Sequence, residues 1–201
     1  RFDDSATADI LADITLLRED IVPLAANRAL NRTATKVRAQ AVRAIAKTTG
    51  VIQKKVRERI TLDESTPQTL AFVVRAQGRR FNLIEFVPTR NQRVGAFRLT
   101  RSGRLRRGGG VKAKPWNIQR EYRGTFIAPG QDSGKLLVYK RDASKRSGIT
   151  GVWGPSIPKT MIEDTIRRLM DVTVDENFED IFARDIQSRL KGFGGRRRKR
   201  R

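Results

Sequence analysis

The chain has 201 residues, of which 38% are hydrophobic and 32% charged, so a buried core is possible only if a good share of the sequence stays on the surface or in tails. It contains no cysteine and no histidine, which excludes disulfide frameworks, thiolate nucleophiles, most zinc sites and the usual general base near neutral pH. Its 43 Lys+Arg against 21 Asp+Glu give a formal charge of +22, which predicts a polyanionic partner, either nucleic acid or a strongly acidic protein surface.

A long helix is predicted from Asp20 to Thr49, after an acidic N-terminal segment of residues 1–19. Asp20 is a possible cap, Pro23 falls in the first turn, and Gly50 follows the end. At about 100° per residue, one stripe of this helix is apolar and consists of Ala26, Leu30, Ala34, Val37, Ala41 and Ile45. A nearly opposite stripe is basic and consists of Arg28, Arg32, Lys36, Arg43 and Lys47. One side is therefore expected to pack and the other to face a partner or water.

The periodicity then changes from helical to extended. A short helix is predicted from Val51 to Ile60. After Pro67, four segments rich in Phe, Val, Ile and Leu are typical of strands: Leu70–Arg75, Phe81–Val87, Arg93–Thr100 and Lys135–Arg141. We expect these strands to form one small antiparallel sheet.

Between the strands lies the segment from Arg101 to Lys114, with the sequence RSGRLRRGGGVKAK. It has four glycines, six basic residues and only two large apolar side chains. Such a segment cannot bury enough surface to offset the entropy lost on ordering. We therefore predict a mobile loop unless a partner holds it.

Two helices are predicted toward the C-terminal end. One starts at about Lys159, after the Pro/Gly-punctuated segment Gly151–Pro158. The other begins with acidic residues, ends before Gly192, and carries an apolar stripe of Phe178, Ile181, Phe182, Ile186 and Leu190. Because Val172, Thr173 and Val174 are weak helix formers, the sequence leaves open whether the two helices are continuous.

These elements predict an α+β fold, in which a long N-terminal helix and the C-terminal helices pack on a small antiparallel β-sheet. Residues 20–191 are expected to form a single domain with the flexible basic loop at 101–114, and residues 192–201 a basic C-terminal tail.

The positive charge is unevenly distributed along the chain. Basic and acidic residues number two and six in residues 1–20, ten and one in 21–61, fourteen and two in 75–124, and six and eight in 159–191. Acidic ends and a basic middle suit identical subunits that touch each other and share one basic surface. The alternative is that alternating charge only keeps the protein soluble.

Three groups of cations are candidates for contact with DNA or another partner. The basic helix face, from Arg28 to Lys47, extends over about 28 Å, comparable with most of a turn of DNA. The basic loop contributes Arg101, Arg104, Arg106, Arg107, Lys112 and Lys114, and the basic tail contributes Arg196, Arg197, Arg198, Lys199, Arg200 and Arg201. Aromatic residues occupy core-like positions outside these runs, so phosphate contact without sequence reading is expected rather than base stacking. For each group, a solvated surface is the alternative.

Enzyme activity is not expected. No phosphate-binding loop of the form G-x-x-x-x-G-K-[ST] occurs. The carboxylates of the central region, Glu85, Glu121, Asp132 and Asp142, are far apart in sequence and could form a metal site only by converging in space. Without histidine, activation of a Ser or Thr nucleophile would fall to Lys or a carboxylate. We predict no catalytic residues, no cofactor, no metal and no small-molecule substrate.

Three segments, in order, resemble the phage minor tail protein Z family. The run Ala26 to Arg43, ANRALNRTATKVRAQAVR, is similar to the N-terminal helix of that family, with its A-x-N-R motif. The segment Gly124 to Arg141, GTFIAPGQDSGKLLVYKR, resembles a strand that leads through a turn into a strand with a basic end. The G-P-S-I-P motif at Gly154 to Pro158 follows and introduces the C-terminal helix. The resemblance covers roughly residues 20–190.

The resemblance implies a virion component at the head-proximal end of a long phage tail, which completes the tail and helps it join the head. The implied partners are other copies of the chain in a ring, expected to be hexameric, other tail and neck proteins such as the tail terminator and the head-tail connector, and double-stranded DNA in the channel. Assembly in the host cytoplasm is expected, with no membrane partner, since no apolar run approaches the roughly 20 residues that span a bilayer. The alternative is a free nucleic-acid-binding protein of architectural or ribosomal type.

Overall fold

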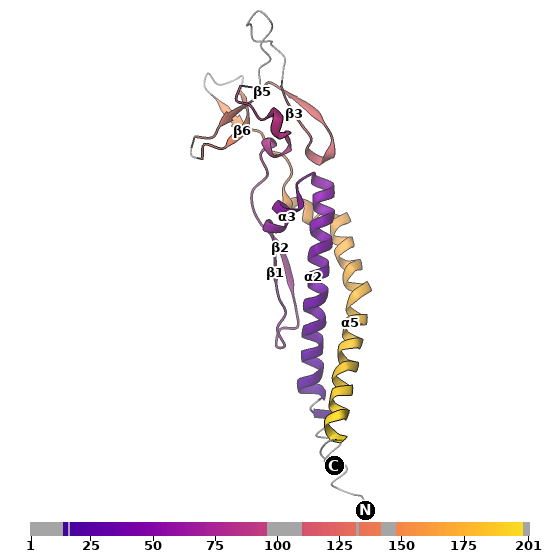
Figure 1. The fold of residues 1–201 in the computed structure, drawn as a ribbon. Coiled ribbons are helices and arrows are strands. Elements are labelled where there is room, and N and C mark those ends of the chain that lie inside the picture. The colour runs from indigo at the N-terminus through magenta and orange to yellow at the C-terminus, as the bar shows by residue number, and fades with distance from the viewer. Residues whose placement is uncertain (1–13, 16, 96–109, 132, 142–147, 199–201) are drawn as a thin grey trace, which may run out of the picture. The chain divides into compact units, whose positions relative to one another are not determined.

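In the computed structural model, the described residues are 14–15, 17–95, 110–131, 133–141 and 148–198 (Figure 1). They belong to two compact units. Unit 1 consists of Arg1–Ala41, Ile60–Arg75 and Arg167–Arg201, and unit 2 of Val42–Arg59 and Ala76–Ile166.

The structure confirms the predicted long N-terminal helix, which is α2 (Val22–Thr49). The other main helices are α3 (Gln53–Arg59), α4 (Ile157–Met161) and α5 (Asp164–Arg198). The shorter helical turns are the π-helix η1 (Leu17–Ile21) and the 3-10 helices η2 (Leu83–Phe86), η3 (Thr89–Asn91) and η4 (Pro115–Asn117). Asp20 is not the cap of α2, because it lies inside η1. Gly50 follows α2 with a φ of +75°, a left-handed conformation that favours glycine.

The buried stripe of α2 follows a spacing of four residues. Its members are Ala25, Ala29, Thr33, Val37, Ala41, Ile45 and Thr49, all at most 2% exposed. Ala26 and Leu30, predicted to lie in the packed stripe, are only half-buried. Because a repeat of four is longer than the 3.6 residues of a helical turn, the buried stripe winds around the helix rather than running straight along it.

The C-terminal helix α5 is continuous, which the sequence left open. It passes through the weak helix formers, among which Thr173 is 6% exposed and donates a hydrogen bond from its hydroxyl to the carbonyl oxygen of Leu169, at 2.7 Å. Burial in unit 1 thus outweighs a small difference in helix propensity. The helix also continues past Gly192 to Arg198, so the predicted end before Gly192 is wrong. Extending a helix that has already formed avoids the cost of nucleating a new one.

In unit 1, α5 lies antiparallel beside α2 (Figure 1). Arg28 of α2 lies 3.5 Å from the carboxylate of Asp185, and Lys36 of α2 donates to the side-chain oxygen of Asn177 at 2.6 Å. The two contacts are eight residues apart on each helix and run in opposite directions, which sets the register of the pair. Within α5, the rings of Phe178 and Phe182 stack at 5.6 Å.

Among the described residues, the strands form three separate sheets instead of the single predicted antiparallel sheet. They are β1 (Ile60–Asp63) with β2 (Val73–Ala76), β3 (Gly110–Ala113) with β4 (Arg120–Arg123), and β5 (Thr125–Pro129), β6 (Leu136–Arg141) and β7 (Ile149–Gly151) in the order β5-β6-β7. The predicted strand Lys135–Arg141 is confirmed as β6, and the predicted strand Leu70–Arg75 in part as β2. The predicted helix Val51–Ile60 is shorter, because Ile60 already begins β1.

The first sheet is attached to α2 within unit 1. The side chain of Asn31 donates to the carbonyl oxygen of Ser65 at 3.0 Å and accepts from its backbone N–H at 2.7 Å. Arg38 donates from Nε to the carbonyl oxygen of Ile60 at 3.0 Å. A pair of strands standing alone is only marginally stable, so these side-chain contacts from the helix help to hold it.

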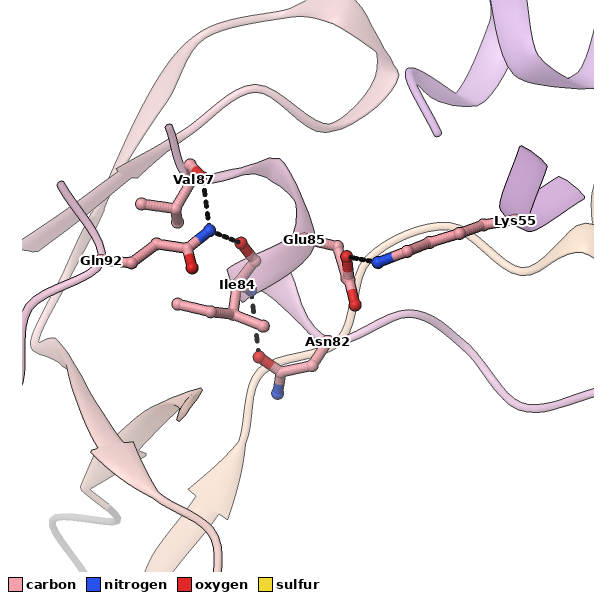
Figure 2. A network of polar contacts seen from close by, with 6 residues as sticks. All are labelled: Lys55, Asn82, Ile84, Glu85, Val87 and Gln92. Carbon is pink, nitrogen blue, oxygen red and sulfur yellow. Dashed lines mark hydrogen bonds and ion pairs between the residues drawn. The ribbon is translucent and has the colours of Figure 1, made fainter. Parts of the chain in front are cut away.

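The segment Phe81–Val87 is not a strand, contrary to the prediction. Asn82 is 5% exposed, and its side-chain oxygen accepts a hydrogen bond from the backbone N–H of Ile84, which turns the chain into η2 (Figure 2). Gln92 donates to the carbonyl oxygens of Ile84 and Val87, at 3.2 and 2.8 Å, and closes the turn from the other side. Five apolar side chains of a segment with the composition of a strand are thus buried in a tight turn. Arg93–Gly95 is not a strand either, and residues 96–100 of the predicted strand Arg93–Thr100 lie outside the described residues.

Part of the predicted loop Arg101–Lys114 is a strand. Residues 110–113 form β3 and pair with β4, in a register that places Val111 opposite Tyr122 and Lys112 opposite Glu121. Val111 and Ala113 are 3% and 1% exposed. The partner strand β4 provides the backbone hydrogen bonds of β3, and the two apolar side chains are buried. The composition of the segment alone did not predict this pairing.

The three-stranded sheet contributes two opposed apolar side chains to the buried part of unit 2. Ile127 of β5 and Val138 of β6 are opposite each other in the register and at most 1% exposed. Asn82 bonds to both the N–H and the carbonyl oxygen of Val138 and so fixes η2 to this sheet. The hairpin β5–β6 matches the two strands expected at Gly124–Arg141, and the α+β class is confirmed.

Candidate functional site

The net positive charge of the chain is unevenly divided between the two units. Of the 43 Lys+Arg and 21 Asp+Glu, unit 2 holds 25 and 7, which leaves 18 and 14 for unit 1. Unit 2 therefore carries +18 of the total +22, and unit 1 only +4. A polyanion is attracted mainly by unit 2.

The basic face predicted on α2 exists as a surface. The helix has six Lys and Arg and no acidic residue. All five predicted side chains, Arg28, Arg32, Lys36, Arg43 and Lys47, are exposed. They do not share one environment, however, because the first three belong to unit 1 and the last two to unit 2.

In unit 1, two cations of this face also bind α5. Asp185, whose side chain is 6% exposed, accepts from Nε of Arg189 at 2.7 Å and lies 3.5 Å from Arg28. Lys36 donates to Asn177. Arg32, between Arg28 and Lys36, has no ion pair within the described part of the chain. The charge of Arg28 is therefore partly compensated before any external partner binds.

In unit 2, Arg43 and Lys47 lie on the segment of α2 that the β3–β4 hairpin reaches. The side chain of Asn117, at the tip of the hairpin, donates to the carbonyl oxygen of Lys47 at 2.6 Å. This bond satisfies a carbonyl in the last turn of α2 that has no partner within the helix. The structure thus brings two of the predicted groups together, because Lys112 and Lys114 precede the same tip.

The hairpin adds cations that we did not predict. Arg120 and Arg123 of β4 are exposed, whereas Lys112 is opposite Glu121, which also accepts from the N–H of Gly110 at 3.1 Å. Tyr122 lies between Glu121 and Arg123, and desolvation by burial raises the pKa of its phenol above the usual value of 10.0, against a smaller lowering by Arg120. The sequence offered no clear signal for this strand, because three of the four residues of REYR are charged and only Tyr122 is apolar.

The tip of this hairpin holds an exposed aromatic ring. Trp116 is 48% exposed, and both Trp116 and Asn117 have left-handed φ angles, of 52° and 58°. A left-handed conformation is unfavourable for a bulky side chain and persists because the surrounding contacts, including the Asn117 bond, hold it. Our expectation that the aromatic residues lie in core positions is wrong for Trp116 and for Trp153, which is 51% exposed.

Several predicted contact residues lie outside the described residues. These are Arg101, Arg104, Arg106 and Arg107 of the basic loop, and Lys199, Arg200 and Arg201 of the tail. Arg196, Arg197 and Arg198 belong to α5 by their backbone.

Within the described part of the chain, no three His, Cys, Asp or Glu side chains come together in a way that could hold a metal ion. Glu85 forms an ion pair with Lys55 (Figure 2), and Glu121 faces Lys112 across the hairpin. Asp132 and Asp142 lie outside the described residues. Among the described helices, none is both long enough and apolar enough to span a bilayer.

The comparisons with known proteins agree with the family resemblance of three motifs. The family model described as prophage minor tail protein Z (GPZ) matches residues 8–196, nearly the whole chain, and so confirms the resemblance. No curated protein and no solved structure matches the chain.

Proposed function

Because the chain belongs to the prophage minor tail protein Z family and is a phage minor tail protein, we propose that it is a structural subunit at the head-proximal end of the tail. In this proposal, copies of the chain form a ring that helps to join the tail to the head and lines the channel for DNA. The neighbours are the tail terminator and the head-tail connector, and the subunit has no catalytic role.

The main support for this proposal is that unit 2 has a formal charge of +18. DNA in a channel must be accommodated whatever its sequence, so its lining should offer cations to phosphates without reading bases. Unit 2 provides such cations from separate elements: Arg43 and Lys47 from α2, Lys114 before η4, and Arg120 and Arg123 from β4. A ring multiplies this surface around one axis.

The position in the virion is the direct test. We expect an antibody or gold label on the chain to appear at the end of the tail next to the head, and particles made without the chain to show tails that do not join heads. A label at the distal end, or normal infectious particles without the chain, would contradict the proposal. A free nucleic-acid-binding protein, the alternative, would be missing from purified virions.

DNA binding by unit 2 is the second test. One variant replaces four exposed cations of unit 2 by alanine: Arg43, Lys47, Lys114 and Arg120. A matched control removes the same amount of charge from α5 in unit 1: Arg167, Arg168, Arg184 and Lys191.

The dissociation constant for a duplex of random sequence is measured by fluorescence anisotropy at several salt concentrations. Each phosphate contact contributes about 0.9 to the slope of log affinity against log salt, so removal of four contacts lowers the slope by about 3 to 4. The control should change it by less than about 1. Equal slopes for the two variants would refute the assignment of DNA to unit 2.

A further inference from the structure

The antiparallel helix pair of unit 1 carries opposite charges on its two exposed faces. On α2, Arg28, Arg32 and Lys36 are exposed and four residues apart. On α5, Asp171, Asp175 and Glu179 are also exposed and four apart. At 1.5 Å per residue, each row spans about 12 Å, with about 6 Å between neighbouring charges.

The acidic face of α5 is broader than this one row. Glu176 and Asp180, again four apart, are exposed beside it. Among the five carboxylates, only Asp180 has an ion pair within the described residues, with Arg184 at 3.6 Å and with both side chains more than 70% exposed. From residue 171 to residue 180, the helix has no basic residue.

This arrangement is unfavourable for an isolated chain. Like charges at a spacing of four repel each other on a helix surface, and α5 has three such pairs, Asp171–Asp175, Asp175–Glu179 and Glu176–Asp180. The row on α2 repeats the same spacing with positive charges. Asp185 compensates Arg28 in part, and the remaining repulsion on each face would be relieved by a partner of the opposite charge.

The helix α2 of the same chain does not supply that partner. At about 100° per residue, Asp175 and Glu179 lie on the side of α5 opposite to Asn177, which contacts α2, and away from the buried Thr173. The other three carboxylates lie toward the edges of this side, and Asp180 lies near Thr173. The centre of the acidic face, Asp175 and Glu179, therefore points away from α2. Val172 lies among the carboxylates and is 49% exposed, so the face also offers apolar surface to a protein partner.

We propose that this acidic face of α5 docks on the Arg28–Lys36 face of α2 in a second copy of the chain. The inference rests on the proposed ring and identifies its contact. Because the two faces differ and lie on different helices, each copy can bind one neighbour through α2 and another through α5. Such a head-to-tail contact generates a closed ring when its rotation closes.

DNA is the less suitable occupant of the Arg28–Lys36 face. Packed helices have axes 8–10 Å apart, a distance similar to the Debye length at physiological ionic strength, so the carboxylates of α5 weaken the attraction of phosphates to this part of α2. A carboxylate-bearing helix with the same charge spacing fits it better. The cations of unit 2 remain available for DNA.

The test is an exchange of charge between two variants of the full chain. Variant X carries Asp175→Lys and Glu179→Lys on α5, and variant Y carries Arg32→Glu and Lys36→Glu on α2. All four side chains are exposed, and Asp185 is left intact in both. Circular dichroism verifies that the helices of each variant are folded.

Assembly is measured by sedimentation velocity in low salt. We expect the wild type to form a ring, X alone and Y alone to sediment as monomers of about 22.8 kDa, and an equimolar mixture of X and Y to recover the ring. In the mixture, the unchanged face of each variant meets the unchanged face of the other, and the two reversed faces are again opposite in charge. A chain that carries all four substitutions should also assemble.

Different outcomes separate the inference from the proposed function. A wild-type ring that persists in X and in Y refutes the docking of these faces but leaves the ring in place. Loss of assembly in X but not in Y shows that the acidic face binds another surface, and also refutes the inference. A wild type that stays monomeric at every concentration, and in the virion as well, refutes the ring itself.

Discussion

Replacement of Asn82 by alanine tests how η2 is held in unit 2. The side chain of Asn82 accepts from the N–H of Val138 at 2.8 Å and from the N–H of Ile84 at 3.1 Å, and it donates to the carbonyl oxygen of Val138 at 3.2 Å. Alanine removes all three bonds. Val138 is fully buried and Ile84 is 7% exposed, so water does not readily replace the lost partner.

The expected loss of stability follows from the two N–H groups left without a partner. A buried donor that loses its acceptor costs about 1–3 kcal/mol, and relaxation around the small cavity recovers part of this. We therefore expect Asn82→Ala to lower the free energy of unfolding by about 3 kcal/mol. The matched control is Asn91→Ala, an exposed asparagine of the same unit, which should change it by less than about 0.5 kcal/mol.

Urea unfolding followed by tryptophan fluorescence provides the measurement, because both tryptophans, Trp116 and Trp153, belong to unit 2. Trp153 is also bridged to Asn82 through the backbone. The expected result is a lower midpoint with an unchanged slope. If Asn82→Ala unfolds within about 1 kcal/mol of the wild type, the three bonds do not hold η2 as described.

Two further substitutions probe the other contacts. Gly50→Ala should lower the free energy of unfolding by about 1–2 kcal/mol, since φ is +75° and the new Cβ would lie 3.2 Å from the backbone N of Asn117; an unchanged urea midpoint would contradict this. Asp185→Asn should cost about 1–2 kcal/mol, because a carboxylate that is 6% exposed loses its charge-assisted bond to Arg189 while the arginine remains partly hydrated. Thermal unfolding followed by circular dichroism at 222 nm measures this loss. A melting temperature of Asp185→Asn equal to that of the wild type would show that the ion pair does not stabilise the fold.

Local periodicity was sufficient to predict the long helix α2. The stretch that became α2 has strong helix signals at both ends, with Pro23 in the first turn and Gly50 after the last. A helix is formed by contacts between residues three and four apart, so a window of sequence contains most of what determines it. The same reasoning predicted β6, a short run of consecutive apolar residues that is preceded by the turn residue Gly134.

The errors occurred where a distant partner decides the conformation. Phe81–Val87 has the composition of a strand, yet Asn82 bonds to Val138, which is 56 residues away, and the chain turns into η2. The end of the glycine-rich segment, residues 110–113, became the strand β3 because β4 pairs with it. Neither partner can be found in a local window, since the free energy that selects the conformation comes from the non-local contact.

For the candidate site too, some features follow from the sequence and others only from the tertiary structure. By itself, the sequence determined the excess of positive charge, the basic face of α2, the absence of cysteine and histidine, and the motifs of the family. Only the tertiary structure separated Arg43 and Lys47, beside the basic hairpin, from Arg28 and Lys36, which contact α5. The physical reason is that the number of charges is a property of the chain, whereas the field at a surface depends on which distant charges the fold places within a Debye length of it.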